Sequence, residues 1–150
     1  ILNNKSNFNR KTDLLLYLAA RSENIDLFKK NHKKKIILID RFVDSTIAYQ
    51  HYGFGIDLNL INLINSNILK RFKVDFTFLN IIDQKNMIKR LKSRKSLNRY
   101  DKFKQKFYLK VQNGFLTIAK KNKKKYKIID SNLDKKVNKL LVINELEKLL

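Results

Sequence analysis

Cysteine, proline and tryptophan are absent from the 150 residues, and only 3 glycines are present. Without cysteine the chain can form neither a disulfide nor a thiolate metal site, and His32 and His51 alone make a poor ligand set. No apolar run approaches the roughly 18 residues of a membrane-spanning helix, and Ile1 to Lys11 is polar, unlike a signal peptide. We therefore expect a soluble, cytoplasmic protein with no membrane partner.

Acidic residues are also scarce: 13 Asp and Glu stand against 34 Lys and Arg, and the formal net charge is +21. A charge of this sign would suit nucleic acid, an acidic membrane surface or phosphorylated small molecules. Much of the excess is lysine in separate runs such as 33–35 and 123–125, whereas a nonspecific phosphate patch needs a concentrated face. Charge alone therefore leaves a non-enzymatic nucleic-acid-binding module open without selecting it.

The hydrophobic content of 43% can bury one sizeable core, and no Pro-, Gly- or Ser-rich linker divides the chain, so we expect a single domain over residues 1–150. Three runs are nearly continuous in apolar residues, as strands buried on both faces are: Lys35–Asp40, Asp75–Ile81 and Lys125–Asp130. Helices are predicted for Thr12–Lys30, Asp57–Arg71, Asp83–Lys95, Asp101–Asn122 and Asp134–Leu150.

Helices that alternate with buried strands indicate an α/β fold, a three-layer α/β/α sandwich around a parallel sheet. Thr12, Asp57, Asp83 and Asp134 precede helical runs, where N-caps belong. A three-stranded parallel sheet is thin for this architecture. The chain also begins with Ile1 instead of methionine, so we expect that N-terminal strands are missing from this stretch.

Tyr17 and Arg21 lie four positions apart on the first predicted helix and so share one helix face. An aromatic ring beside the hydrogen-bond donors of a guanidinium suits the binding of a planar base. An exposed pair making a cation–π contact explains the same spacing, so this segment alone does not decide between the two interpretations.

Asp40 and Arg41 follow the first predicted strand, at the edge where open parallel sheets bind ligands. The carboxylate can orient Mg²⁺ or its water, and the guanidinium can fork onto a phosphate. An ordinary ion pair at a strand end is the alternative. Hydroxyl, amide and phenol groups follow within about two helical turns; they belong to Ser45, Thr46, Tyr49 and Gln50.

Two blocks together resemble the thymidylate kinase family: Leu-Tyr-Leu-Ala-Ala-Arg at 16–21, and Asp-Arg-Phe-Val-Asp-Ser-Thr-Ile-Ala-Tyr-Gln at 40–50 with paired glycines after it. The likeness continues almost to the carboxyl terminus. It implies a P-loop nucleoside monophosphate kinase fold and the phosphorylation of dTMP to dTDP with ATP and Mg²⁺, in dTTP biosynthesis. Another P-loop nucleoside or nucleotide kinase with a different base preference is the alternative within this chemistry.

The resemblance also implies substrate-binding roles within about 12–56. Tyr17 is similar to the residue that stacks on thymine, and Arg21 to the arginine that bonds the base edge near the monophosphate. Tyr49 resembles the ring that packs on the sugar and disfavours a 2′-hydroxyl. Asp40 resembles the carboxylate that serves Mg²⁺ indirectly and the phosphoryl region, and Arg41 the arginine on the substrate phosphate. The other substrate-binding candidates are Ser45, Thr46 and Gln50.

Cations cluster along 89–101, which is similar to the lid of the family, and we assign the lid to about 90–103. A closing lid needs such donors to meet charge on the transferred phosphoryl group. A solvated basic helix face is the alternative. In bacterial-type members the lid supplies the catalytic arginine; the resemblance makes Arg94 and Arg99 the candidates here, with Arg90 and Lys92 in support.

The chain departs from the family pattern at Phe54, where many members have Arg, at Asn98, where Asp is usual, and at Asp101, which replaces Glu. The larger departure is that Gly-x-x-x-x-Gly-Lys-[Ser/Thr], the loop that wraps ATP phosphates, occurs nowhere in the 150 residues. In the family this loop follows the central first strand. We therefore expect both upstream of Ile1, and expect the 150 residues alone to be poorly stable and inactive as a kinase.

Helices 12–30 and 57–71 carry more apolar residues than one sheet face requires. In the family, helices of this region pair two subunits, so the resemblance implies a homodimer that binds dTMP and ATP. Core packing alone explains the same pattern.

Overall fold

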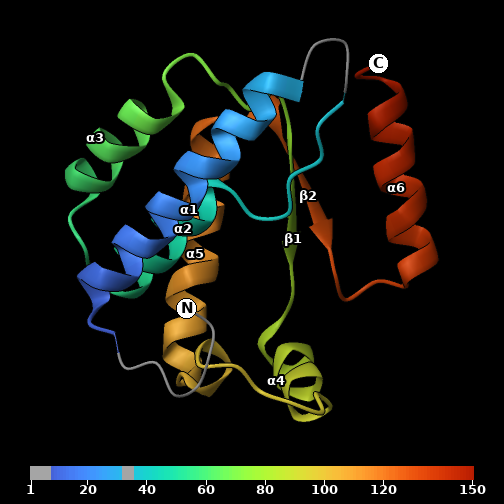
Figure 1. Cartoon of the computed structure of the whole chain (residues 1–150). Helices are drawn as coiled ribbons and strands as arrows, with labels where there is room; N and C mark the ends of the chain where they lie inside the picture. The colour runs from blue at the N-terminus through green and yellow to red at the C-terminus, as the bar shows by residue number, and fades with distance from the viewer. Residues whose placement is uncertain (1–7, 32–35) are drawn as a thin grey trace.

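The computed structural model describes residues 8–31 and 36–150, in which helices surround a short parallel sheet (Figure 1). The helices are α1 (Arg10–Asn31), α2 (Val43–Thr46), α3 (Leu58–Leu69), α4 (Gln84–Lys92), α5 (Gln105–Lys121) and α6 (Lys135–Glu147). A π-helix, η1 (Ile47–Gly53), continues α2, and the 3₁₀ turns η2 (Tyr100–Lys102) and η3 (Lys123–Lys125) flank α5. The strands are β1 (Thr77–Ile81) and β2 (Tyr126–Asp130).

β1 and β2 pair in parallel, from Thr77 opposite Tyr126 to Ile81 opposite Asp130. The Ser131 N–H donates to the Ile81 carbonyl at 2.7 Å and continues the ladder by one bond. α5 contacts β1 and α6 contacts β2, and in Figure 1 the two helices lie on opposite sides of the strands. This order of helix, sheet and helix confirms the predicted α/β fold class and two of the predicted parallel strands.

The predicted strand Lys35–Asp40 is wrong for the residues that the structure describes. Residues 36–40 form no strand, and Lys35 lies outside the described residues. Ile36 is 65% exposed and Leu38 is 81% exposed. The run has the side chains of a strand, but a ladder also needs a neighbour that takes up its N–H and C=O groups. Among the described residues, the sheet contains only β1 and β2.

The main hydrophobic cluster lies where α1 packs on α3. Leu14, Leu18 and Ile61 are each at most 2% exposed, and the two leucines share a face of α1 because they are four positions apart. The outer faces keep apolar side chains as well, since Leu15 is 57% and Leu63 is 62% exposed. Packing of α1 on α3 therefore uses only part of the apolar surface of these helices.

Three of the four predicted N-caps are confirmed. The carboxylates of Asp57, Asp83 and Asp134 accept backbone N–H bonds of 2.7 to 2.8 Å at the starts of α3, α4 and α6. The cap predicted at Thr12 is wrong: α1 begins at Arg10, and the Asn9 side chain accepts the Thr12 N–H at 2.8 Å. Asparagine caps a helix as well as threonine does, so the boundary moves by one turn.

The predicted helix Asp101–Asn122 is interrupted near its start. The Asn98 side chain accepts the N–H groups of Tyr100 at 2.8 Å and Asp101 at 3.1 Å, while the Asp101 carboxylate accepts the Asn98 N–H at 3.0 Å. Such local bonds compete with helix hydrogen bonds. As a result η2 forms first, and α5 begins only at Gln105.

η1 packs very closely on α5. A Cβ atom at Gly53 would lie 2.7 Å from the Phe107 ring, and one at Gly114 would lie 2.6 Å from the Tyr52 ring. Neither position has room for a side-chain carbon, so the two glycines set the separation of η1 and α5. This contact places η1, which carries several of the predicted site residues.

Replacing Gly114 with alanine is expected to lower the free energy of unfolding by about 1–2 kcal/mol, because overpacking outweighs the gain in helix propensity. Chemical denaturation measures the change. The matched control is Asn113→Ala, at an exposed position of the same helix, for which we expect a change within about 0.5 kcal/mol. A Gly114→Ala protein as stable as the control would contradict the close contact with Tyr52.

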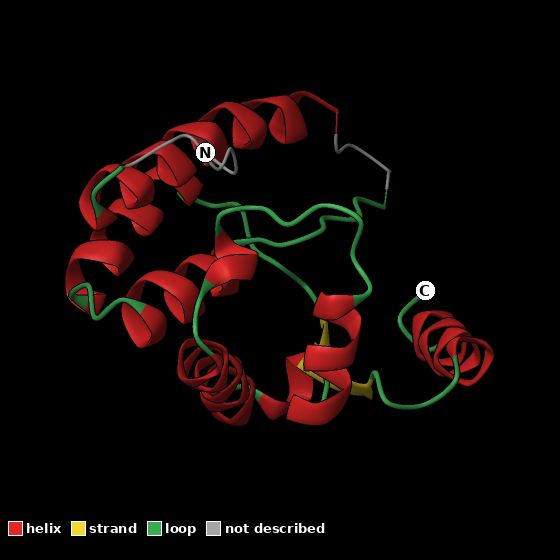
Figure 2. Cartoon of the chain, turned by 90° about the horizontal axis from the view of Figure 1, so that it is seen from below, coloured by secondary structure: helices red, strands yellow, loops and turns green. Residues whose placement is uncertain are grey.

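The last helix stands apart from the others. Figure 2 shows α6, beside the C label, separated from the remaining helices. Its apolar side chains are largely uncovered, with exposures of 37% to 60% at Val137, Leu140, Leu141 and Ile143. No helix in the described part of the chain has the length and hydrophobicity required to cross a membrane.

Candidate functional site

The centre of the candidate site is the Tyr100 ring, which is 8% exposed. Tyr17 from α1 lies edge-on to it with ring centroids 6.4 Å apart, and Tyr49 from η1 does so at 5.5 Å. Phe54 and Phe103 complete the surroundings at 6.2 and 5.6 Å. We call these five rings the Tyr100 cluster. It joins α1, η1 and the end of the 90–103 segment.

Polar groups meet at the hydroxyl of Tyr100. The Gln50 amide donates to this hydroxyl at 3.4 Å, and the hydroxyl donates to the Asp13 carboxylate at 3.4 Å. Arg99 forms an ion pair with the same carboxylate, and its guanidinium lies 5.3 Å from the Tyr100 ring centroid. Burial, together with Tyr17 and Asp13, raises the pKa of Tyr100 far above its ordinary value. The phenol is therefore neutral at physiological pH and keeps the proton that it donates to Asp13.

Arg21 is buried, at 9% exposure, and its guanidinium is committed to protein acceptors. It donates to the Thr46 hydroxyl at 2.7 Å, to the Asn65 side chain at 3.0 Å and to the Phe42 carbonyl at 3.0 Å. Burial lowers the pKa of Arg21, and the nearby Asp44 carboxylate opposes this shift. The predicted site residues Arg21 and Thr46 thus meet directly, as partners of each other.

Asp40 and Arg41 are both exposed, at the end of the 36–40 run. Arg41 has a φ of 63°, in the left-handed region that non-glycine residues seldom occupy and that often marks functional sites. Its guanidinium lies 5.4 Å from the Tyr49 ring centroid. Ser45 is half-buried in the first turn of α2, where its N–H donates to the Phe42 carbonyl at 3.1 Å. Arg41 therefore offers a charged group beside the Tyr100 cluster.

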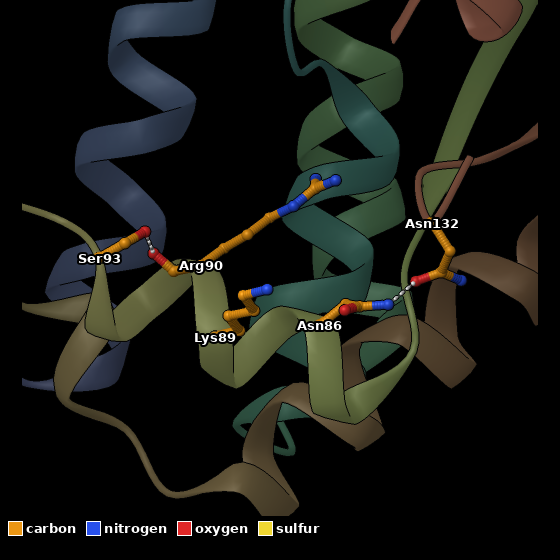
Figure 3. Close-up of a pocket in the computed structure, with 5 residues that line it drawn as sticks. All are labelled: Asn86, Lys89, Arg90, Ser93 and Asn132. Carbon is orange, nitrogen blue, oxygen red and sulfur yellow. Dashed lines mark hydrogen bonds between the residues drawn. The ribbon is translucent and has the colours of Figure 1, made fainter. Parts of the chain in front are cut away.

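The other predicted lid cations lie away from this cluster. Arg94 forms an ion pair with Asp101 at 2.6 Å while its own side chain stays 52% exposed. Arg90 donates to the Ser131 carbonyl at 2.6 Å, and Lys92 is exposed. Arg90 also borders a cavity of about 280 Å³ between α4 and the loop after β2 (Figure 3), lined as well by Asn86, Lys89, Ser93 and Asn132.

Comparison with known proteins decides the family. The sequence profile of the family described as "Thymidylate kinase" matches residues 1–141. The chain belongs to the thymidylate kinase family.

Individual thymidylate kinases agree with this assignment. That of Trichodesmium erythraeum (strain IMS101) is 40% identical over 124 residues, covering 81% of this chain and 55% of that protein. That of Ehrlichia canis (strain Jake) is 39% identical over 123 residues, covering 81% and 58%. The crystal structure of thymidylate kinase from Ehrlichia chaffeensis superposes with a TM-score of 0.73 at 31% identity, over 95% of this chain and 70% of that one. The chain thus spans little more than half the length of the first two relatives.

The structure brings four predicted site residues to the Tyr100 cluster: Tyr17, Tyr49, Gln50 and Arg99. Arg41 joins them through Tyr49, and Arg21 joins Thr46 in a separate buried network. Asp40 and Ser45 lie near these groups along the chain. Arg90, Lys92 and Arg94 belong neither to the Tyr100 cluster nor to the Arg21 network.

Sequence reasoning missed Asp13, Asn65 and Tyr100. Asp13 had a signal, because it lies one turn before Tyr17 and two before Arg21 on the same face of α1. Its carboxylate is 4% exposed, which makes it the most buried acid of this site. Asn65 had no comparable signal, since it stands among several similar asparagines of α3.

The site offers little for a metal held by the protein alone. No group of three or more His, Cys, Asp or Glu side chains suited to a metal occurs among residues 8–31 and 36–150. Asp40 is a single exposed carboxylate. A donor set of this kind fits Mg²⁺ that is bound chiefly by nucleotide phosphates and water, as the indirect role predicted for Asp40 requires.

Proposed function

We propose that this chain provides the dTMP-binding and lid parts of an enzyme that phosphorylates dTMP to dTDP with ATP. The observation that carries the proposal is the convergence of Tyr17, Tyr49 and Gln50 on the Tyr100 cluster, with the Arg41 guanidinium beside it. Stacking surfaces, an amide and a cation are what a nucleoside monophosphate needs for its base, its sugar and its phosphate.

In this proposal each side chain has one task. Tyr17 stacks on thymine, Thr46 and Gln50 meet its edge, and Tyr49 packs on the deoxyribose. Arg21 acts on the base edge chiefly by holding Thr46, to which it donates at 2.7 Å. Arg41 takes the substrate phosphate, with Ser45 supporting the turn that follows it.

Phosphoryl transfer needs positioning and compensation of charge more than covalent work by the protein. Arg94 is our candidate for the lid cation that meets the transferred group, because its side chain is 52% exposed and its ion-pair partner, Asp101, lies in the same segment. Arg90, Lys92 and Arg99 support it. Mg²⁺ bound with the nucleotide would offset the charge of the phosphates, near Asp40. Since no P-loop occurs in the 150 residues, we propose that the activity belongs to a longer parent enzyme.

We further propose a cytoplasmic homodimer. The exposed apolar side chains of α1 and α3 support the pairing of two copies along these helices; they include Leu15, Leu27, Leu60 and Leu63, at 41% to 62% exposure. Large apolar side chains that are exposed together on one pair of packed helices indicate a surface that another protein covers.

Calorimetric titration of the chain with dTMP tests the proposal, because the side chains assigned to dTMP all lie within this chain. We expect binding by the unaltered chain and a loss of roughly 5- to 100-fold for Tyr17→Leu, the range expected when one base–aromatic stack is removed. Phe28→Leu is the matched control, since Phe28 lies on the same helix but packs on Phe72 at 5.9 Å, outside the Tyr100 cluster. Equal affinities of the three proteins would contradict the assignment.

Competition among dTMP, dUMP, dCMP and dGMP in the same titration separates dTMP kinase from another nucleotide kinase. One observation favours the different class of nucleic-acid-binding modules: five lysines line a cavity of about 440 Å³ at 120–125. DNA binding that weakens steeply with salt, in a chain that ignores dTMP, would support that module.

A further inference from the structure

Asp13 and Arg99 form the most buried ion pair of the described residues, with side-chain exposures of 4% and 16%. They are 86 positions apart in the chain. Asp13 lies in the first turn of α1, and Arg99 lies just before η2. The pair therefore fastens the end of the 90–103 segment to the helix that carries Tyr17.

This contact is incomplete as a salt bridge. One carboxylate oxygen of Asp13, Oδ1, and the Nε of Arg99 are buried without a hydrogen-bond partner. A bidentate arginine–carboxylate pair would satisfy more of these atoms, and unsatisfied buried polar atoms reduce stability. Native structures retain few such atoms, and each calls for a reason other than stability. The surrounding geometry indicates that the pair serves to position Arg99 and its neighbour Tyr100.

The same carboxylate also accepts the Tyr100 hydroxyl at 3.4 Å, and that hydroxyl accepts the Gln50 amide at 3.4 Å. Arg99 in turn lies over the Tyr100 ring. Asp13 is thus bonded to two consecutive residues near the end of the 90–103 segment, Arg99 and Tyr100. Without this carboxylate, no other acid among the described residues pairs with Arg99.

We propose that Asp13 is a positioning residue, which holds Arg99 and Tyr100 against Tyr17 and so completes the wall of the base site. This inference rests on the proposed function. Asp13 acts through its neighbours and touches no reacting atom. A consequence is that Arg99 serves as the anchor of the 90–103 segment, which leaves the exposed Arg94, paired with Asp101 of the same segment, as the candidate cation for the phosphoryl group.

Titration of the 150-residue chain with dTMP and with thymidine tests this role. We expect Asp13→Asn to weaken the binding of both ligands by the same factor, tenfold or more, because the defect lies in the base wall and thymidine carries no phosphate. Asp13→Glu keeps a carboxylate within reach of Arg99 and is expected to bind within about threefold of the unaltered chain. Asp26→Asn is the control: Asp26 is an exposed acid of the same helix, and its loss is expected to leave both affinities unchanged.

Circular dichroism at the titration temperature separates loss of binding from loss of folding. If Asp13→Asn is unfolded there, Arg99→Lys replaces it: the charge is kept but the fork is lost, and we again expect equal losses for dTMP and thymidine. Unchanged thymidine binding by the folded variant, or a loss confined to dTMP, would overturn the positioning role. Failure of the unaltered chain to bind dTMP, when circular dichroism shows that it is folded, would instead overturn the proposed function, and this inference with it.

Discussion

Replacing Arg21 with methionine is expected to lower the free energy of unfolding by about 2–4 kcal/mol, because several acceptors lose the charged donor that they share. Methionine fills a similar volume but donates no hydrogen bond. The acceptors of Thr46, Asn65 and Phe42, now bonded to Arg21 at 2.7 to 3.0 Å, would remain buried without this donor, at a cost of about 1–3 kcal/mol for each one left unsatisfied.

Urea denaturation followed by circular dichroism measures this change. Arg71→Met is the matched control, because Arg71 is exposed after the end of α3 and surface substitutions stay within about 0.5 kcal/mol. An Arg21→Met protein that unfolds at the same urea concentration as the control would show that the buried network contributes nothing to the fold.

Alkaline pH is expected to destabilise the protein steeply above about pH 10. Burial raises the pKa of Tyr17, Tyr100, Tyr108 and Tyr126, that of Tyr108 to about 12. Below pH 10 both the folded and the unfolded chain keep these phenols protonated, so the stability is complete. Above it the unfolded chain releases its protons first, and each raised group removes about 1.4 kcal/mol per pH unit until its folded pKa is passed.

Denaturant unfolding at intervals between pH 8 and pH 12 checks the slope, and Tyr108→Phe isolates one group. At pH 8 this variant should lose about 1 kcal/mol, because the Tyr108 hydroxyl donates to the Tyr100 carbonyl at 2.6 Å. Above pH 10 its curve should fall less steeply, by one group, so that the two curves cross between pH 10 and pH 12. Lysine deprotonation affects both proteins equally and cancels in the difference. Parallel curves would contradict the raised pKa of Tyr108.

The parts of the fold that follow from local chemistry were predictable from the sequence. Apolar runs predicted β1 and β2, and acidic residues ahead of helical runs predicted the caps Asp57, Asp83 and Asp134. The run 36–40 carries the same kind of signal and forms no strand, because pairing depends on a neighbour that no local pattern reports. The side-chain bonds of Asn98 with Asp101 likewise set the start of α5 through contacts that helical periodicity does not contain.

In the candidate site, too, local spacing was predictable and tertiary contacts were not. The spacing of Tyr17 and Arg21 predicted that both face one side of α1, which the structure bears out. It could not predict that Arg21 is already bonded to Thr46, since that contact joins residues 25 positions apart. Nor could the run of cations along 89–101 indicate that Arg99 turns inward to Asp13 while Arg94 stays exposed. Composition reveals which charges a segment carries, but only the tertiary fold assigns each one a partner.

The segment 83–103, which contains the predicted lid, is bonded at both ends to residues that are distant in the chain. At one end, Asp83 and Arg90 bond to the turn after β2, across 49 and 41 positions; at the other, Arg99 bonds to Asp13 across 86. Contacts of such separation form only after large loops have closed, and the entropy of closure must be met first. We therefore expect the segment 83–103 to be among the last parts of the chain to order during folding, with mutations there changing the unfolding rate more than the folding rate.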